Sequence, residues 1–226
     1  KDSNMYEHID PKLVGNKPRV LVTDLSGKSN ISFMATELDI KYKDSKEITS
    51  KLVSKVKDLE FEGYQFEAAD ASLELILREL SGEYSPFFKV LDSKVHISYD
   101  ESGTEKADAT LKVLVGDDIE HTASDGDGPV DALNNALRKA LAMFFPELKD
   151  VRLTDYKVRV LNEQEGTGAK VRVLIESAYE DDSWSTIGVS KNIIEASRQA
   201  LSDSFNYRLA KLSNWSNKNK KSLQLS

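Results

Sequence analysis

The sequence contains no cysteine among its 226 residues. A disulfide-stapled scaffold, a thiol nucleophile and a zinc site built on thiolates are therefore excluded. Long hydrophobic runs are also missing, because no stretch approaches the roughly 20 apolar residues that cross a bilayer. No signal-peptide pattern opens the chain. We therefore expect a cytoplasmic protein with no membrane partner.

Basic residues are too few for a nucleic-acid surface. Lys and Arg number 31 against 38 Asp and Glu, which gives a formal net charge of −7. Neutralising phosphates needs a dense basic surface, so we expect no nucleic-acid partner. The one locally basic stretch lies at the C-terminal end and contains Lys218, Lys220 and Lys221. Its polar, low-complexity composition predicts a disordered tail over residues 213–226.

The residue patterns of enzymes are absent as well. The three histidines, His8, His96 and His121, do not have the spacing of a metal-ligating pair. No phosphate-binding glycine loop, dinucleotide fingerprint or nucleophile elbow occurs. We therefore expect no catalytic residue, no metal site and no cofactor in this chain, and an enzyme complete within it is disfavoured.

The N-terminal segment, residues 1–32, has a turn-rich, loop-like composition. It contains two prolines and a single short apolar run at residues 19–22, so it cannot bury a core of its own. We expect this segment to dock on a domain that is missing here, and the chain to be a fragment.

The pattern of apolar residues over 44–81 predicts two helices. Asp44 and Glu47 have the spacing of a capping box, and apolar residues recur at helical intervals after them. Gly63 interrupts this pattern and Gly82 ends it. We therefore predict a helical pair within residues 44–81.

An internal repeat follows. Without any gap, 107–145 aligns with 167–205, and the two stretches share ten identities. The identical residues of the first copy are Ala109, Val113, Leu114, Glu120, Gly128, Ala136, Arg138, Ala140, Leu141 and Phe145. In each copy, alternating apolar residues predict strands, and an apolar stripe of helical period then predicts a helix, at 129–145 and 190–209. The sequence therefore predicts an α+β fold in which two βββα modules follow the helical pair.

The outward face of the second strand in each module has a mixed composition. It carries Lys112 and Leu114 in the first copy and Arg172 and Leu174 in the second. An antiparallel sheet often has one wet face, so this pattern fits either a solvated face or a face that meets a partner.

The segment Asp125-Gly126-Asp127-Gly128-Pro129-Val130-Asp131 holds most of the recognisable chemistry. Pro129 suits the first position of a helix, whose free N–H groups favour an anion. Three aspartates would repel a phosphate, but a ligand with both a carboxylate and an ammonium fits, as in an amino acid. The alternative is that the aspartates only cap the helix and shape the turn.

Several motifs resemble the C-terminal allosteric and dimerisation region of the alpha-isopropylmalate synthase family. They are Gly126-Asp-Gly-Pro-Val-Asp-Ala132, Asp155-Tyr-Lys-Val-Arg-Val160 and Gly166-Thr167 with Ala169. Stretches at 14–16, 24–30, 64–72 and 184–197 are similar to the (R)-citramalate synthase branch. The resemblance runs from about His8 to Leu209, which is nearly the whole chain.

The resemblance implies that catalysis and regulation belong to different parts of the parent protein. The family's catalytic unit is a metal-dependent (β/α)8 barrel that condenses acetyl-CoA with a 2-oxo acid, and it would precede Lys1. Residues 1–33 would be the linker, 34–85 a helical communicating subdomain and 86–212 a regulatory domain that dimerises. The parent enzyme would be an acyltransferase that uses a divalent metal and acetyl-CoA.

The resemblance also implies a site for the end product of the pathway. The polar end of this effector would lie at Gly126, Asp127, Gly128, Pro129, Val130 and Asp131. Its aliphatic side chain would contact Leu153, Tyr156, Val160, Thr167, Ala169 and Val171. The effector would be isoleucine in a citramalate synthase and leucine in an isopropylmalate synthase, held near a homodimer interface. A purely structural dimerisation domain remains an alternative.

Overall fold

The computed structural model describes residues 46–223, and its first elements are two helices. These are α2 (Lys46–Glu62) and α3 (Asp70–Ser81), joined through a 3-10 turn at Phe66–Ala68. We refer to α2 and α3 as the helical pair. Gly63 and Gly82 follow the two helices with φ of 113° and 75°, so both predicted helix ends are confirmed. The predicted linker and the helix start at Asp44 lie outside the described residues.

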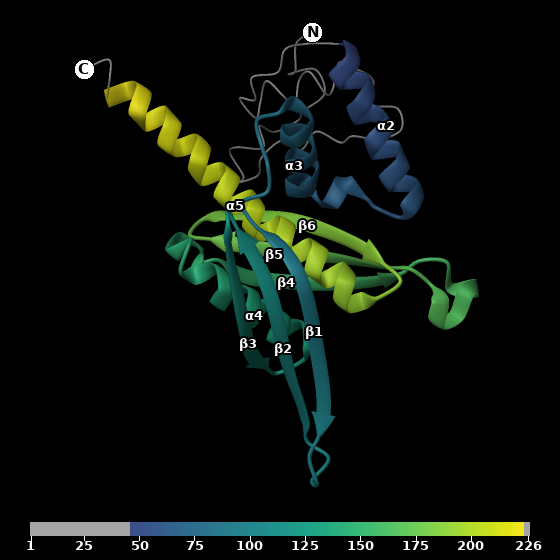
Figure 1. Cartoon of the computed structure of the whole chain (residues 1–226). Helices are drawn as coiled ribbons and strands as arrows, with labels where there is room; N and C mark the ends of the chain where they lie inside the picture. The colour runs from purple at the N-terminus through teal and green to yellow at the C-terminus, as the bar shows by residue number, and fades with distance from the viewer. Residues whose placement is uncertain (1–45, 224–226) are drawn as a thin grey trace.

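Two modules of three antiparallel strands and one helix follow the helical pair (Figure 1). The first contains β1 (Lys89–Tyr99), β2 (Glu105–Val115), β3 (Asp118–Gly126) and α4 (Pro129–Ala142). The second contains β4 (Arg152–Val160), β5 (Val171–Tyr179), β6 (Asp182–Ser190) and α5 (Ile193–Leu223). In Figure 1 the strands of the first sheet run across those of the second. The predicted α+β fold with two βββα modules is therefore confirmed.

Helix α5 is longer than the sequence predicts. It begins at Ile193, where Asn192 Oδ1 accepts a hydrogen bond from the N–H of Ile194 at 2.9 Å. It then continues to Leu223, past residue 213 where the sequence predicts a disordered tail. Residues 193–223 contain neither glycine nor proline, so no residue in the stretch terminates the helix.

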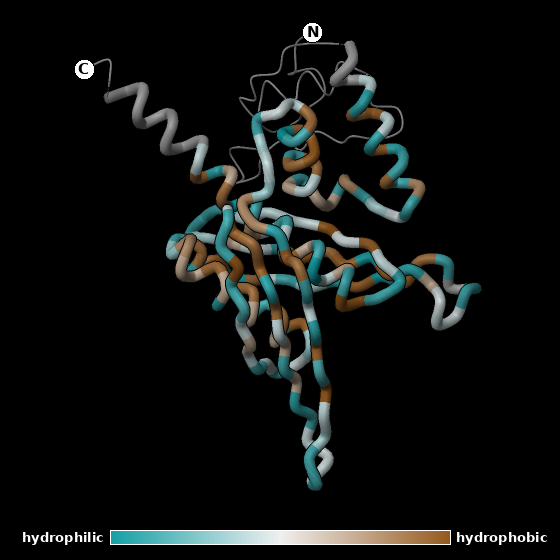
Figure 2. The backbone as a smooth tube through the Cα atoms, in the orientation of Figure 1, coloured by the Kyte–Doolittle hydropathy of each residue, from teal (hydrophilic) through white to brown (hydrophobic). Residues whose placement is uncertain are grey.

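One apolar core joins the two modules. It contains the inward residues of the middle strands, such as Leu111, Val113 and Ile175, and buried residues of α4 and α5, such as Leu137 and Phe205. These inward residues alternate along each strand with polar or half-exposed ones. In Figure 2 hydrophobic residues follow α3 and the packed parts of both sheets, whereas the β1–β2 hairpin tip is hydrophilic. The two modules therefore fold as one unit.

The outer face of the second sheet is covered by the helical pair. Ile187 on β6 is 1% exposed, and with Leu174 on β5 it packs against apolar residues of α2 and α3. The backbone carbonyl of Gly63 and the side chain of Gln65 accept hydrogen bonds from Arg172 at 2.6 and 2.7 Å. The outer face of the second module is therefore not solvated, and what covers it is the chain's own helical pair, which is neither of the two possibilities that the mixed composition suggested.

The outer face of the first sheet is open within the part of the chain that the structure describes. Lys112 is exposed, and Ile119 is 61% exposed. Thr110 and Ala123 occupy the positions that correspond to Leu174 and Ile187, and they offer little apolar area for a helix to bury. The two outer faces therefore differ in composition as well as in what covers them.

The structure aligns the two modules with an offset of 64 residues, whereas the gap-free sequence alignment uses an offset of 60. The repeat is therefore confirmed, but the residue correspondence predicted from the sequence is wrong. Leu111 pairs with Thr122 in the first sheet, and its structural counterpart Ile175 pairs with Thr186 in the second. Thr122 Oγ1 donates to the carbonyl of Ala136 at 3.0 Å, and Thr186 Oγ1 makes the same bond to Ala200 at 2.8 Å. The two registers differ by four positions, which equal two strand periods and about 1.1 helical turns, so both preserve the apolar pattern.

Candidate functional site

The loop between β3 and α4 is shaped by a close backbone approach. A Cβ atom on Gly126 would lie 2.1 Å from the backbone nitrogen of Ala132, so only glycine fits there. Gly128 is the N-cap of α4, and its carbonyl accepts the first helical hydrogen bond from Ala132 at 2.9 Å. The N–H groups of Val130 and Asp131 therefore lie ahead of the helical ladder, where an anion is favoured.

Asp131 holds this loop together. Its Oδ2 accepts hydrogen bonds from the backbone N–H of Asp127 at 3.0 Å and from Asn135 Nδ2 at 3.2 Å. Asn135 Nδ2 also donates to the carbonyl of Asp125 at 3.2 Å. The carboxylate therefore stabilises the turn, as the capping alternative predicts. No hydrogen bond from residues 46–223 reaches Oδ1, so this exposed oxygen is still able to receive a ligand ammonium.

The predicted aliphatic residues lie along β4, β5 and their connection. Leu153, Tyr156 and Val171 are half-buried against the main core. Tyr156 pairs with Ile175, and its hydroxyl lies 2.9 Å from Ser197 Oγ on α5. Ser197 Oγ donates to the carbonyl of Ile193 at 2.7 Å, so the tyrosine hydroxyl is the donor between them. Tyr156 therefore lies against the N-terminal end of α5.

The remaining predicted residues differ in exposure. Val160 pairs with Val171 and is 47% exposed. Ala169 is buried, and Thr167 is exposed in the 3-10 turn Glu163–Gly168. The structure therefore forms two local groups, the β3–α4 loop in the first module and the β4–β5 residues in the second. Among the described residues no hydrogen bond joins these two groups.

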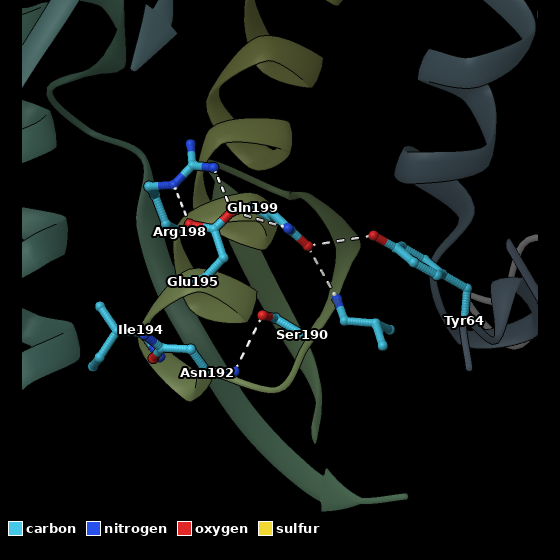
Figure 3. Close-up of polar contacts among 8 residues, drawn as sticks. Tyr64, Ser190, Asn192, Ile194, Glu195, Arg198 and Gln199 are labelled. Carbon is cyan, nitrogen blue, oxygen red and sulfur yellow. Dashed lines mark hydrogen bonds and ion pairs between the residues drawn. The ribbon is translucent and has the colours of Figure 1, made fainter. Parts of the chain in front are cut away.

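The second module has its own loop at the corresponding place, and pattern analysis missed its polar network (Figure 3). Glu195 corresponds to Asp131 and accepts hydrogen bonds from Arg198 at 2.7 and 2.6 Å and from Gln199 at 3.0 Å. The Arg198 guanidinium lowers the pKa of Glu195. Because its carboxylate already faces a cation, this loop is a poorer site for a ligand ammonium.

The first module lacks that internal cation. Asn134 occupies the position that corresponds to Arg198, and it accepts a hydrogen bond from Arg138 Nε at 3.3 Å through Oδ1. Asp131 therefore has hydrogen-bond donors but no side-chain cation among its contacts in the described chain. The gap-free repeat alignment hid this difference, since it matches Arg198 with Arg138 instead of with Asn134.

Comparison with known proteins identifies the family. Residues 67–209 match the LeuA allosteric (dimerisation) domain. The chain belongs to this family. The matched range includes α3, the whole first module, and the second module as far as Leu209 of α5.

Several longer proteins are similar to this chain over most of its length. An (R)-citramalate synthase of Geobacter sulfurreducens is 50% identical over 211 residues, covering 91% of this chain and 39% of that protein. One of Aquifex aeolicus is 47% identical over 212 residues, covering 93% and 40%. A 2-isopropylmalate synthase of Shewanella woodyi is 27% identical over 211 residues, covering 89% and 36%. The chain thus spans about two-fifths of the length of these relatives.

None of the helices between residues 46 and 223 is long and apolar enough to cross a membrane.

Proposed function

We propose that the chain is the regulatory part of an (R)-citramalate synthase and binds isoleucine as a feedback inhibitor. The observation that best supports this is the identity of 50% and 47% with two (R)-citramalate synthases over more than nine-tenths of the chain. Identity with the Shewanella 2-isopropylmalate synthase is 27% over a similar length. In the whole enzyme, acetyl-CoA and pyruvate would condense in a metal-dependent barrel formed by another part of the protein.

The two ends of the amino acid have different partners in this proposal. Its carboxylate accepts hydrogen bonds from the N–H groups at the start of α4, and its ammonium pairs with Asp131 Oδ1. The absence of a cation beside Asp131 among the described residues supports this orientation, because the ligand supplies the missing positive charge. The aliphatic side chain packs against Leu153, Tyr156 and Val160, close to a homodimer interface.

Inhibition follows from a shift of populations. Isoleucine binds one arrangement of the regulatory dimer better than the other, and the helical pair transmits this preference to the barrel. The contact of the helical pair with the outer face of the second sheet supports this route. By linkage, substrate bound to the barrel changes the affinity for isoleucine by the same factor.

Leucine is the second candidate effector. The similarity to a 2-isopropylmalate synthase supports it, and the two amino acids differ only in the placement of one methyl group. An apolar pocket discriminates such a difference by only about 1–3 kcal/mol. A purely structural dimerisation domain is the other alternative, supported by the two bonds through which Asp131 already caps its own loop.

Calorimetric titration with isoleucine, leucine and valine tests the proposal, with the solution mass measured in each state. We expect saturable binding with isoleucine tightest. Tightest binding of leucine would assign the domain to the isopropylmalate branch. A dimer that binds none of the three would support the structural alternative.

A further inference from the structure

The outer edge of β6 is covered by side chains instead of another strand. The N–H of Ser185 donates to Asp70 Oδ1 at 3.3 Å, and that of Ile187 donates to Ser72 Oγ at 3.1 Å. Asp70 and Ser72 both belong to α3. The next edge N–H, that of Val189, donates to Gln199 Oε1 on α5 at 3.2 Å. The edge of the second sheet is therefore held by the helical pair and by α5 together.

Gln199 also joins these two elements to each other. Its Oε1 accepts a second hydrogen bond, from the Tyr64 hydroxyl at 3.3 Å, while its Nε2 donates to Glu195 (Figure 3). One amide thus links the end of β6, the first turns of α5 and the connection between α2 and α3. Both Tyr64 and Gln199 are half-buried, where a hydrogen bond is less weakened by water.

The corresponding residue of the first module lacks this third link. Asn135 donates to Asp125 and Asp131, both within its own module. The longer side chain of Gln199 instead presents its oxygen to β6 and Tyr64, and its nitrogen to Glu195. The link to the helical pair is therefore specific to the second module and is not required by the βββα architecture.

The turn around Tyr64 is pressed against the end of the second sheet. A Cβ atom on Gly63 would lie 2.3 Å from Leu161 Cδ1 and 3.6 Å from Val189 Cγ1. Leu161 directly follows Val160, and Ser197, which contacts Tyr156, lies two residues before Gln199 on α5. The turn at 63–65 and the predicted aliphatic pocket therefore share the same end of the sheet.

We propose that the Tyr64–Gln199 hydrogen bond couples residues 189–199 to the helical pair and carries the response to a bound effector. The effector part of this inference rests on the proposed function. The coupling itself is a property of the free protein. Local unfolding of residues 189–199 should increase local unfolding of α2, and loss of the Tyr64 hydroxyl should remove this dependence.

A mutant cycle followed by hydrogen exchange tests the coupling without any ligand. Asn192→Ala removes the cap of α5 and loosens residues 189–199. We expect exchange of residues 46–62 to rise severalfold in this variant of the full chain, and not to rise when Tyr64→Phe is also present. Tyr99→Phe, which removes a hydroxyl bonded to Glu105 at the far hairpin, is the matched control and should leave the response intact. An equal rise in both backgrounds, or a rise in neither, would overturn the coupling.

The same variants then test the response to effector. Saturating isoleucine should slow exchange in both 189–199 and 46–62 of the wild-type chain. In Tyr64→Phe, isoleucine affinity should stay within about threefold, because the Tyr64 hydroxyl bonds Gln199 and none of the proposed effector residues, while the change in 46–62 disappears. An undiminished change in 46–62 would overturn the role of this bond. If isoleucine and leucine do not bind, the proposed function fails, and the ligand-free cycle still decides the coupling.

Discussion

At the scale of single residues, Asp131 has a structural role and a proposed binding role that one substitution separates. Asp131→Asn keeps an oxygen that can accept from Asp127 and Asn135 but removes the charge that would pair with a ligand ammonium. We expect isoleucine binding to weaken by about 1–3 kcal/mol, the usual cost of an unpaired charged group, with little change in thermal stability. Calorimetry measures the loss. Asp125→Asn, in the same loop, is the control, and an equal loss in both variants would contradict the assignment.

Asp203 on α5 predicts a pH dependence of stability. Burial and the nearby Glu79 on α3 raise its pKa from 3.8 to about 7, against a hydrogen bond from Ser72 and the positive charge of Arg198. The folded state therefore binds the proton more tightly than the unfolded state does. The contribution of Asp203 to folding stability is fully present below about pH 4 and is lost as the pH rises through about 7.

Asp203→Asn should remove that loss. We expect the variant to be more stable than the wild-type chain at pH 8, by at most about 4 kcal/mol from the shift of some three pKa units, and the gap to close toward pH 4. Urea denaturation at several pH values measures this difference. A gap that is the same at pH 4 and pH 8 would show that ionisation of Asp203 does not contribute.

At the scale of elements, the junction of β3 and α4 depends on one glycine. Gly126→Ala places a methyl group against the backbone of Ala132, which cannot rotate away, so we expect a loss of about 1–3 kcal/mol, as for overpacking. Gly128→Ala is the matched control: its Cβ would meet nothing within 4 Å, and it should change stability by less than about 1 kcal/mol. Thermal denaturation compares the two, and equal losses would indicate that the helix start adjusts freely.

The elements of the fold could be predicted from periodicity, but their register could not. Strand and helix patterns located both βββα modules because apolar residues alternate in β2 and β5 and recur every three to four positions in α4. The gap-free alignment of Leu111 with Val171 scores well because it differs from the true match, Leu111 with Ile175, by whole strand periods and about one helical turn. Only contacts distinguish the two, as in the bonds of Thr122 and Thr186 to the following helices.

The candidate site was predictable to a similar extent. The loop at 125–131 could be recognised because glycine, proline and aspartate cluster in it. The network of Tyr64, Glu195 and Gln199 could not be, because Tyr64 and Gln199 are 135 residues apart and neither position is unusual in composition. Only the correct register shows that Asn134 in the first module corresponds to Arg198 in the second, which is the difference in charge between the two loops.

At the scale of the whole molecule, the two modules are alike in fold but different in what they contact. The helical pair covers the outer face of the second sheet through Ile187, which is 1% exposed, and Leu174. The first sheet has Thr110 and Ala123 at these positions. The two modules therefore present one outer face that the helical pair covers and one that is open among the described residues, so the outer-face contacts with the helical pair come from the second module.

This asymmetry predicts which part of the molecule unfolds first. Ile187→Ala removes buried volume beneath the helical pair and should cost about 2–4 kcal/mol, while Ile119→Ala on the open face of the first sheet should cost less than about 0.5 kcal/mol. We expect Ile187→Ala also to make residues 46–81 sensitive to limited proteolysis before the two modules, because the modules supply nearly all of the shared core, to which α3 adds only Ala71 and Leu75. Mass spectrometry of the early fragments identifies which part is released. Simultaneous cleavage of the helical pair and the modules would mean instead that they unfold as one cooperative unit, and that the second sheet requires its helical cover to remain folded.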